Sequence, residues 1–218
     1  MQKIDLLSLL FPKKCILCGK RVNNIICNHC FVAISKQNLF HLQNYSHQFF
    51  QKHLYMFSYE GEIRKIILNY KFNNQSYLLD YFVEIIIKNE KICRFLKTYD
   101  IIIPVPIHKK RKNERGYNQS ELISKVIAKE LNIKHFTDVL VKTMNTTPQS
   151  SLTKNERFAN SKNVYKIQNI QKIKEKRVIL FDDIFTTGAT ANSCARLLKE
   201  NGVKEILIFT IAKDILKN

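Results

Sequence analysis

Apolar residues recur with two different periods along this chain. Ile63, Ile66, Ile67 and Tyr70 follow the spacing i, i+3, i+4, i+7, which predicts a helix with one apolar face. Short apolar runs bounded by turn residues predict buried strands instead, and they lie at 54–59, 101–105, 177–181 and 205–212. Strands and helices therefore alternate, and this alternation predicts an α/β fold whose sheet is mostly parallel and flanked by helices.

Three further helices follow from the same periodicity. Ser76 is a suitable N-cap for the first, and Gly202 is expected to end the last. The inward faces that we expect are Leu78, Leu79, Phe82, Ile85 and Ile86; Leu122, Ile123, Val126, Ile127 and Leu131; and Ala191, Cys194, Ala195 and Leu198. Residues 143–163 show little periodicity, and we expect a long functional loop there.

The first 45 residues follow a different pattern, because four of the six cysteines lie there. We therefore expect two units: a small four-cysteine zinc ribbon at 1–45 and a larger α/β domain at 46–218. The cysteines form two C-x-x-C pairs, Cys15 with Cys18 and Cys27 with Cys30. Two such pairs supply a closed tetrahedral S₄ site, which is typical of structural zinc.

Alternatives to this zinc site are a disulfide or unrelated thiols, and the paired spacing argues against both. His29 is a weak alternative ligand, and Gly19 suits the tight turn after the first pair. Cys93 and Cys194 fall on or near apolar helix faces, so we expect them to be small core residues.

Composition excludes several classes of protein. Hydrophobic residues make up 45% of the 218 residues, which argues against wholesale disorder. The apolar runs are too short to span a membrane, and the start of the chain lacks the features of a signal peptide. We therefore expect a cytoplasmic protein, in a compartment where thiols stay reduced.

Charge suggests a class of partner without fixing it. Lys and Arg number 36 against 18 Asp and Glu, for a formal net charge of +18. Such an excess suits a polyanion such as nucleic acid or a phosphate-rich substrate. A general compositional bias is the alternative, because Lys accounts for most of the positive charge and Arg is the residue that binds phosphate in a bidentate way.

The stretch from 178 to 190 carries the most specific chemistry. An apolar strand leads into Asp182 and Asp183, and a hydroxyl-rich turn with one glycine then opens a helix. Ligands of open α/β sheets bind at such strand ends, and backbone N–H groups at a helix N-terminus favour a phosphate. The turn residues that we expect to hold it are Thr186, Thr187, Gly188, Ala189 and Thr190. An ordinary strand, turn and helix is the alternative.

This stretch resembles the phosphoribosyl-pyrophosphate (PRPP) motif of type I phosphoribosyltransferases. The resemblance implies that Asp182 and Asp183 hold the ribose hydroxyls and that the turn wraps the 5′-phosphate, with Mg²⁺ accompanying PRPP. Purine enzymes of this class often have an Asp at the position of Thr186, and a threonine cannot act as a general base at neutral pH. Purine transfer by that route is therefore not expected.

A second constellation follows the strand at 101–105. Five of the seven residues from 109 to 115 are basic, and we expect them to form a turn that can neutralise a pyrophosphate. In an active transferase, Arg111, Lys112 and Arg115 would stabilise the leaving group. The loop that carries Arg157 would close over the site and exclude water. A solvated charged loop is the alternative.

Taken together, the motifs resemble the ComF family of competence proteins over nearly the whole chain. They read FPKKCILCGK, YEGEIRKIILNYKF, PVPIHKKRKNERGYNQ, TPQSSLTKNERFAN and VILFDDIFTTGAT. The resemblance implies a zinc region joined to a phosphoribosyltransferase-type domain that handles incoming single-stranded DNA on the cytoplasmic side, near the inner face of the membrane. Asn163 and Tyr165 depart from the Gly and Phe that the family often has, which weakens the detailed assignment of that loop.

Three functions stay open at this point. In the first, the chain binds single-stranded DNA and uses the PRPP pocket as a sensor or keeps it as a relic. In the second, the chain is an active phosphoribosyltransferase whose acceptor the sequence does not name. In the third, the zinc ribbon docks a DNA-uptake or helicase protein. Aromatic residues that would stack on bases are Tyr55, Phe57, Tyr59, Phe72 and Tyr77, although core packing is an alternative for each.

Overall fold

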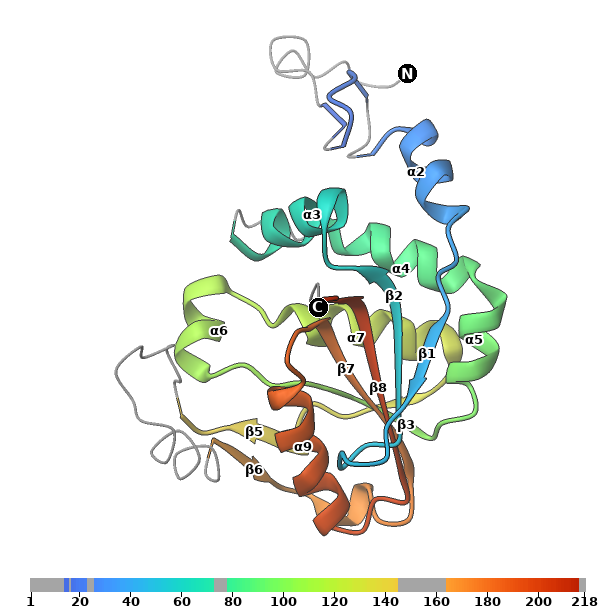
Figure 1. Ribbon diagram of the computed structural model, residues 1–218. Coiled ribbons are helices and arrows are strands. Elements are labelled where there is room, and N and C mark those ends of the chain that lie inside the picture. The colour runs from blue at the N-terminus through green and yellow to red at the C-terminus, as the bar shows by residue number, and fades with distance from the viewer. Residues whose placement is uncertain (1–13, 16, 23–25, 73–77, 145–163, 216–218) are drawn as a thin grey trace.

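One six-stranded sheet forms the centre of the protein (Figure 1). The computed structural model describes residues 14–15, 17–22, 26–72, 78–144 and 164–215. The strand order is β1-β2-β8-β7-β3-β4, and only β1 and β2 are antiparallel neighbours. The strands are β1 (His41–Asn44), β2 (Lys52–Ser58), β3 (Ile101–Pro104), β4 (Lys134–His135), β7 (Arg177–Phe185) and β8 (Glu205–Lys213). The predicted mostly parallel sheet is confirmed.

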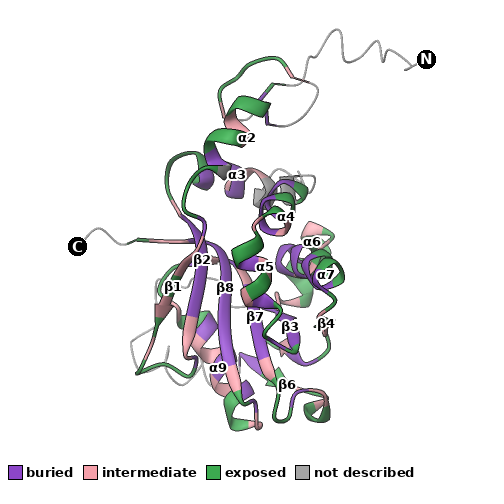
Figure 2. Cartoon of the chain, turned by 90° about the vertical axis from the view of Figure 1, so that its right-hand side faces the viewer, coloured by how far each residue is buried: buried purple, intermediate pink, exposed green. Residues whose placement is uncertain are grey.

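Two layers cover the faces of this sheet. On one face the core joins the sheet to α4 (Leu78–Lys88), α5 (Glu90–Leu96) and α7 (Gln119–Leu131). The other face packs against α9 (Ala189–Glu200) and a two-stranded antiparallel pair, β5 (Leu140–Lys142) with β6 (Tyr165–Ile167). As a consequence, β2, β7 and β8 are buried along most of their length (Figure 2).

The remaining elements lie outside these layers. They are α2 (Asn28–Ser35), α3 (Gly61–Phe72), α6 (Lys109–Arg115) and the short 3₁₀ helix η1 (Ile170–Lys172). In Figure 1, α2 and α3 lie beyond the carboxyl ends of the parallel strands, which is the edge where the motif at 182–190 emerges. None of the helices that the structure describes is long and apolar enough to cross a membrane.

The predicted strands and most helix faces are confirmed. Ile63, Ile66 and Ile67 are buried on α3, and Ala191, Cys194, Ala195 and Leu198 are buried on α9. β7 is longer than predicted, since it continues past both aspartates to Phe185. Ser76 and Arg157, which were expected to act as an N-cap and in a covering loop, lie outside the described residues.

Two predictions are wrong. The basic run 109–115 is the helix α6 rather than a turn, because the ring of His108 accepts a hydrogen bond from the N–H of Lys110 and Gly116 ends the helix with φ 79°. On α7, Leu122 and Val126 are exposed, whereas Ile123 is fully buried. Ser120 and Ser124 occupy the buried face instead, so the helix is rotated away from the expected orientation.

The boundary expected at residue 45 falls inside the sheet. β1 precedes it and pairs with β2 through His41 to Asn44. The main sheet therefore begins before residue 45, and the short polar β1 carries no apolar signal in the sequence.

Candidate functional site

The motif at 178–190 lies at the carboxyl end of a central strand. β7 is flanked by β8 and β3, both parallel to it, and α9 starts at Ala189 directly after the turn 186–188. The hydroxyl-bearing Thr186, Thr187 and Thr190 are exposed. A helix N-terminus presents unpaired N–H groups and a partial positive charge, so this turn is suited to an anion such as a phosphate.

Gly188 occupies a position that only glycine fits. Its φ is +76°, in the left-handed region. A Cβ at this position would lie 2.5 Å from Cζ of Phe185, well inside van der Waals contact. The backbone of the turn therefore rests on the Phe185 ring.

A histidine from another strand supports this ring. His53 of β2 is fully buried, and its ring centroid lies 4.2 Å from that of Phe185. Its Nε2 is 2.8 Å from the hydroxyl of Thr210 on β8, a residue that also lines the cavity at the turn. Burial, reinforced by the charge of Lys213, lowers the pKa of His53 to about 3, so the ring is neutral at physiological pH. Sequence reasoning missed His53, because a single histidine in an apolar strand gives no signal.

The two aspartates have different surroundings. Asp182 lines a cavity of about 60 Å³ together with the turn residues 186–190, whereas Asp183 is only 6% exposed and does not line it. Consecutive residues of a strand project to opposite faces, which explains the separation. Oδ1 of Asp182 accepts hydrogen bonds from the hydroxyl of Ser120 and from the N–H of Asp183, both at 2.9 Å. Ser120 thus orients the carboxylate beside the turn.

The basic residues of α6 differ in how they are held. Nζ of Lys112 lies 2.8 Å from Oε2 of Glu121, and Arg115 donates a 3.4 Å hydrogen bond to Oε1 of Gln119. These two side chains are therefore tied to α7. Arg111 is exposed, and burial together with the positive charge of Arg111 lowers the pKa of Lys142 on β5.

The rest of that motif joins α6 to the sheet. Asn118 is the N-cap of α7, where its Oδ1 accepts from the N–H of Ser120. Its amide nitrogen donates to the carbonyl of Val105, immediately after β3. Asn118 therefore fixes the start of α7, and with it Ser120, against the end of β3.

The four predicted cysteines come together. The sulfurs of Cys15, Cys18, Cys27 and Cys30 all lie within 4.8 Å of one another, and those of Cys18 and Cys27 are 3.7 Å apart. Zn–S bonds of about 2.3 Å in a tetrahedron place sulfurs about 3.8 Å apart, so the donor set and spacing fit a structural zinc ion. Gly19 has φ +72° and its N–H donates to the carbonyl of Cys15, which closes the predicted tight turn.

Comparisons with known proteins identify the family to which this chain belongs. The family model "Phosphoribosyl transferase domain" matches residues 118–216. Competence protein F of Haemophilus influenzae is 32% identical over 152 residues, which cover 68% of this chain and 66% of that protein. Competence protein ComFC of Bacillus subtilis is 27% identical over 208 residues, which cover 92% of this chain and 78% of that protein. The chain belongs to the ComF family.

More distant relatives of this ComF-family chain match shorter stretches. DNA utilization protein YhgH of Escherichia coli K12 is 27% identical over 120 residues, so the match spans about half of each protein (55% of this chain and 52% of YhgH). Among solved structures, adenine phosphoribosyltransferase from Trypanosoma brucei is 13% identical with a TM-score of 0.41, covering 84% of this chain and 78% of that one. Similarity that low says nothing about the site. The phosphoribosyltransferase-type fold expected of the family is confirmed by the family model and the sheet.

A larger cavity of about 490 Å³ lies elsewhere in the ComF-family chain, between the cysteine cluster and α3. Its walls include Leu17, Ile34 and Phe57, and two acids, Glu60 and Glu62, border it. Apolar walls and negative charge do not suit a polyanion. This cavity therefore does not extend the anion site at the turn after β7.

We predict that Gly188→Ala is much more destabilising than Gly116→Ala. Both glycines have a positive φ, but a Cβ at Gly116 meets no atom within 4 Å, whereas one at Gly188 meets the Phe185 ring. The shared backbone strain costs about 1–2 kcal/mol, and overpacking adds about 1–3 kcal/mol at Gly188 alone. The free energy of unfolding from urea titrations measures the difference. Equal losses in the two variants would show that the ring does not confine the turn.

Proposed function

We propose that this ComF-family protein binds PRPP with Mg²⁺ at the carboxyl end of β7. The observation that carries the proposal is one cavity lined by both the turn 186–190 and the carboxylate of Asp182. An anion-binding turn beside an acceptor of hydroxyl hydrogen bonds suits a sugar phosphate. The family match over 118–216 supports the same ligand class.

In this proposal, different residues bind different parts of PRPP. The turn amides, with the hydroxyls of Thr186, Thr187 and Thr190, bind the 5′-phosphate. Asp182, held by Ser120, accepts hydrogen bonds from the ribose hydroxyls. Buried Asp183 adds negative charge next to Asp182, and we propose that Arg157, which lies outside the described residues, acts on the bound ligand. Mg²⁺ neutralises part of the diphosphate charge when PRPP is bound.

Phosphoribosyl transfer to an acceptor is the second candidate function, and the donor cavity at Asp182 favours it. A transfer step needs a nucleophile, and Thr186 stands where many purine enzymes have a base. Pyrophosphate release from PRPP, assayed with nucleobases, amines and single-stranded DNA as acceptors, tests this function directly. No release with any acceptor would reject transfer while leaving PRPP binding intact.

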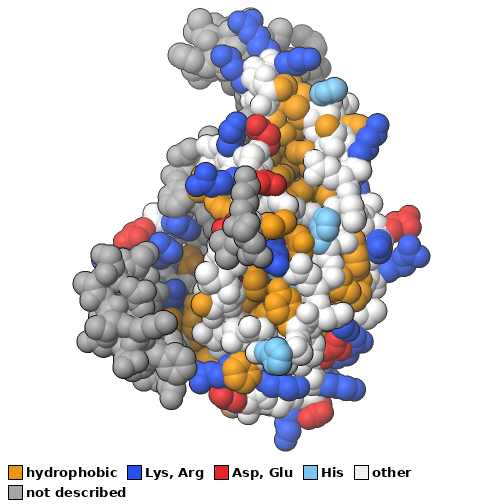
Figure 3. Space-filling view, viewed as in Figure 1, with side chains coloured by type: hydrophobic (Ala, Val, Ile, Leu, Met, Phe, Trp, Pro, Cys, Tyr) orange, Lys and Arg blue, Asp and Glu red, His pale blue; other side chains and the backbone are white. Residues whose placement is uncertain are grey.

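We further propose a role in natural transformation, in which the protein contacts incoming single-stranded DNA on the cytoplasmic side together with DNA-uptake or helicase proteins. Relatives named for competence and for DNA utilization support this role. The net charge of +18 supports a polyanion partner, and Figure 3 shows many more basic than acidic side chains on one face. Lys109 and Lys110 on α6 are exposed and add to this charge.

Tyr55 and Phe57 are poor candidates for stacking on bases, because they are 7% and 3% exposed. Tyr59 is half-buried and stays a candidate, and the side chains of Phe72 and Tyr77 lie outside the described residues. We propose that phosphate contacts by lysines carry most of the DNA affinity.

We also propose that the cysteine cluster binds one structural zinc ion. Its ribbon is coupled to the large domain, because Phe31 of α2 packs edge-to-face on Tyr81 of α4 with ring centroids 5.6 Å apart. The N–H of Cys27 donates to Sγ of Cys15 at 3.4 Å, and such a contact favours the thiolate that zinc requires.

Asp182→Asn is expected to weaken PRPP binding about tenfold or more, because the ribose hydroxyls lose a charged acceptor. Glu200→Gln is the control, since it removes one negative charge at the exposed far end of α9. Calorimetry with PRPP and Mg²⁺ measures both affinities. Unchanged affinity in Asp182→Asn, in a protein that still melts cooperatively, would contradict the assignment.

For DNA, the double variant Lys109→Gln/Lys110→Gln is expected to bind single strands more weakly. Its log–log salt slope should fall by roughly 0.7 for each phosphate contact that is lost. Lys174→Gln/Lys176→Gln changes the charge equally near the start of β7 and should leave the slope unchanged. Fluorescence anisotropy of a labelled oligonucleotide gives the slopes. No binding by the wild-type protein at low salt would reject the DNA role.

For zinc, we expect one equivalent of metal in the purified protein and its loss in Cys30→Ser. Cys93→Ser should keep the full equivalent, because Cys93 lies outside the cluster on α5. Elemental analysis by mass spectrometry gives the content. A metal-free wild-type protein, purified without chelator, would mean that the cluster is not a zinc site.

A further inference from the structure

An exposed aromatic ring lies on the loop 45–51, which connects β1 to β2. Phe49 is 42% exposed, whereas every other phenylalanine and tyrosine side chain that the structure describes is buried or half-buried. A single exposed apolar side chain is common in proteins and needs no explanation by itself. Two further features, the way its loop is held and a charge beside it, distinguish Phe49.

The loop is fixed on both sides of the ring. The backbone N–H of Phe49 donates a 2.9 Å hydrogen bond to Oδ1 of Asn192 on α9. The next residue, Phe50, is only 1% exposed. Gln51 donates its N–H to the carbonyl of Ile206 at 3.2 Å, and its side chain accepts from the N–H of Ile206 at 3.0 Å. An ordered backbone therefore presents the Phe49 ring to solvent, and an ordered ring loses little entropy when it binds a partner.

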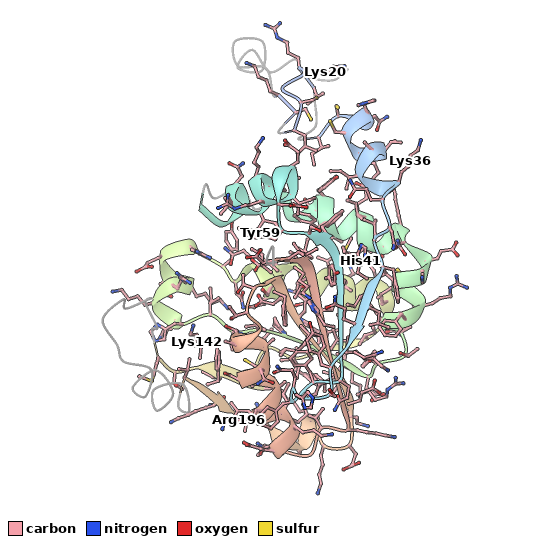
Figure 4. All side chains as sticks on the ribbon, in the orientation of Figure 1. Lys20, Lys36, His41, Tyr59, Lys142 and Arg196 are labelled. Atoms are coloured by element: carbon pink, nitrogen blue, oxygen red, sulfur yellow. The ribbon has the colours of Figure 1, made fainter. Side chains whose placement is uncertain are left out.

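An unpaired cation lies on the same face of α9. Arg196 follows Asn192 by four residues, so the two side chains are neighbours on the helix surface. Arg196 is half-buried and makes no ion pair with any carboxylate that the structure describes. Figure 4 shows Arg196 on α9, and Figure 1 shows the β1–β2 loop beside this helix. A fixed aromatic ring and an unpaired guanidinium thus share one surface.

The surroundings of the ring favour a nucleic acid base over a protein partner. The three loop residues before it, Ser46, His47 and Gln48, are polar and exposed. The apolar surface is therefore a single ring, whereas a stable protein interface buries a much larger area. A base stacks its π face on one aromatic ring, and a neighbouring phosphate suits the planar guanidinium of an arginine.

We propose that Phe49 and Arg196 form a contact site for single-stranded DNA. Phe49 stacks on a base, and Arg196 binds a phosphate of the same strand. This site rests on the proposed DNA role, and it names the place on the protein where a strand binds.

The first experiment compares two labelled oligonucleotides of equal length, one normal and one without bases. Phe49→Ala should weaken binding of the normal strand about tenfold, the effect of losing one stacked base, and change the affinity for the abasic strand less than about twofold. The salt slope should equal that of wild type, because no phosphate contact is lost. Phe49→Tyr keeps the ring and should retain the affinity. Fluorescence anisotropy gives the affinities, and thermal unfolding verifies that each variant is folded.

Arg196→Gln should weaken binding of both strands to a similar extent and lower the log–log salt slope by roughly 0.7. The matched controls are Leu122→Ala and Arg94→Gln, which remove an exposed apolar side chain and a positive charge from α7 and α5 on the opposite face of the sheet. Both controls should bind like wild type.

A tryptophan gives a direct readout of stacking. The sequence contains no Trp, so Phe49→Trp carries a single reporter whose fluorescence should fall with the normal strand and stay unchanged with the abasic one. Equal affinities of wild type and Phe49→Ala for the normal strand, an equal loss in Leu122→Ala, or an unquenched reporter in saturating DNA would overturn the site. Wild-type protein that binds no single-stranded DNA at low salt would instead overturn the proposed DNA role.

Discussion

The contact between the backbone of Gly188 and the ring of Phe185 constrains the rest of the candidate site. The ring packs against His53 of β2, and His53 is hydrogen-bonded to Thr210 of β8. Side chains from three adjacent strands, β2, β8 and β7, therefore hold the backbone of this turn in position. Because protein interiors are close-packed, a change of volume in any of these side chains shifts the amides that would bind a phosphate. The shape of the turn is thus a property of the sheet as well as of the motif.

Much of this fold could be predicted, because its signals are local. Parallel strands that are buried on both faces read as apolar runs, and the end of β7 and the turn after it combine two carboxylates, hydroxyls and a glycine within nine residues. The two C-x-x-C pairs are equally local, and their sulfurs meet as expected. In these places the chemistry of neighbouring residues is sufficient to specify the structure.

The predictions that failed or were missed depend on distant contacts. α6 has no apolar face, so its helical state rests on the cap by His108 and on Gly116. β5 and β6 are three residues each and pair across more than twenty residues, which no short-range pattern reveals. Ser120 gains its importance only because tertiary packing brings its hydroxyl to Asp182. Charge and motif patterns in the sequence therefore do not identify residues whose role depends on tertiary contacts.

A network of ion pairs lies at the end of the sheet opposite the candidate site. At the start of β8, Glu205 accepts from Lys52 at 2.9 Å, from Arg177 at 3.0 Å and from the hydroxyl of Tyr99. One carboxylate there satisfies two cations. At the other end of the sheet, Asp182 lines the cavity together with the turn 186–190.

The pairing of β1 with β2 has a consequence for dissecting this protein into parts. Cutting the chain at residue 45 would remove β1 along with the cysteine cluster. β2, which has five consecutive buried residues, would then become an unprotected border of the sheet, prone to self-association. A truncated protein that precipitates or loses a partner would therefore reveal nothing about the cysteine cluster. A shorter deletion that ends before His41 separates the two effects.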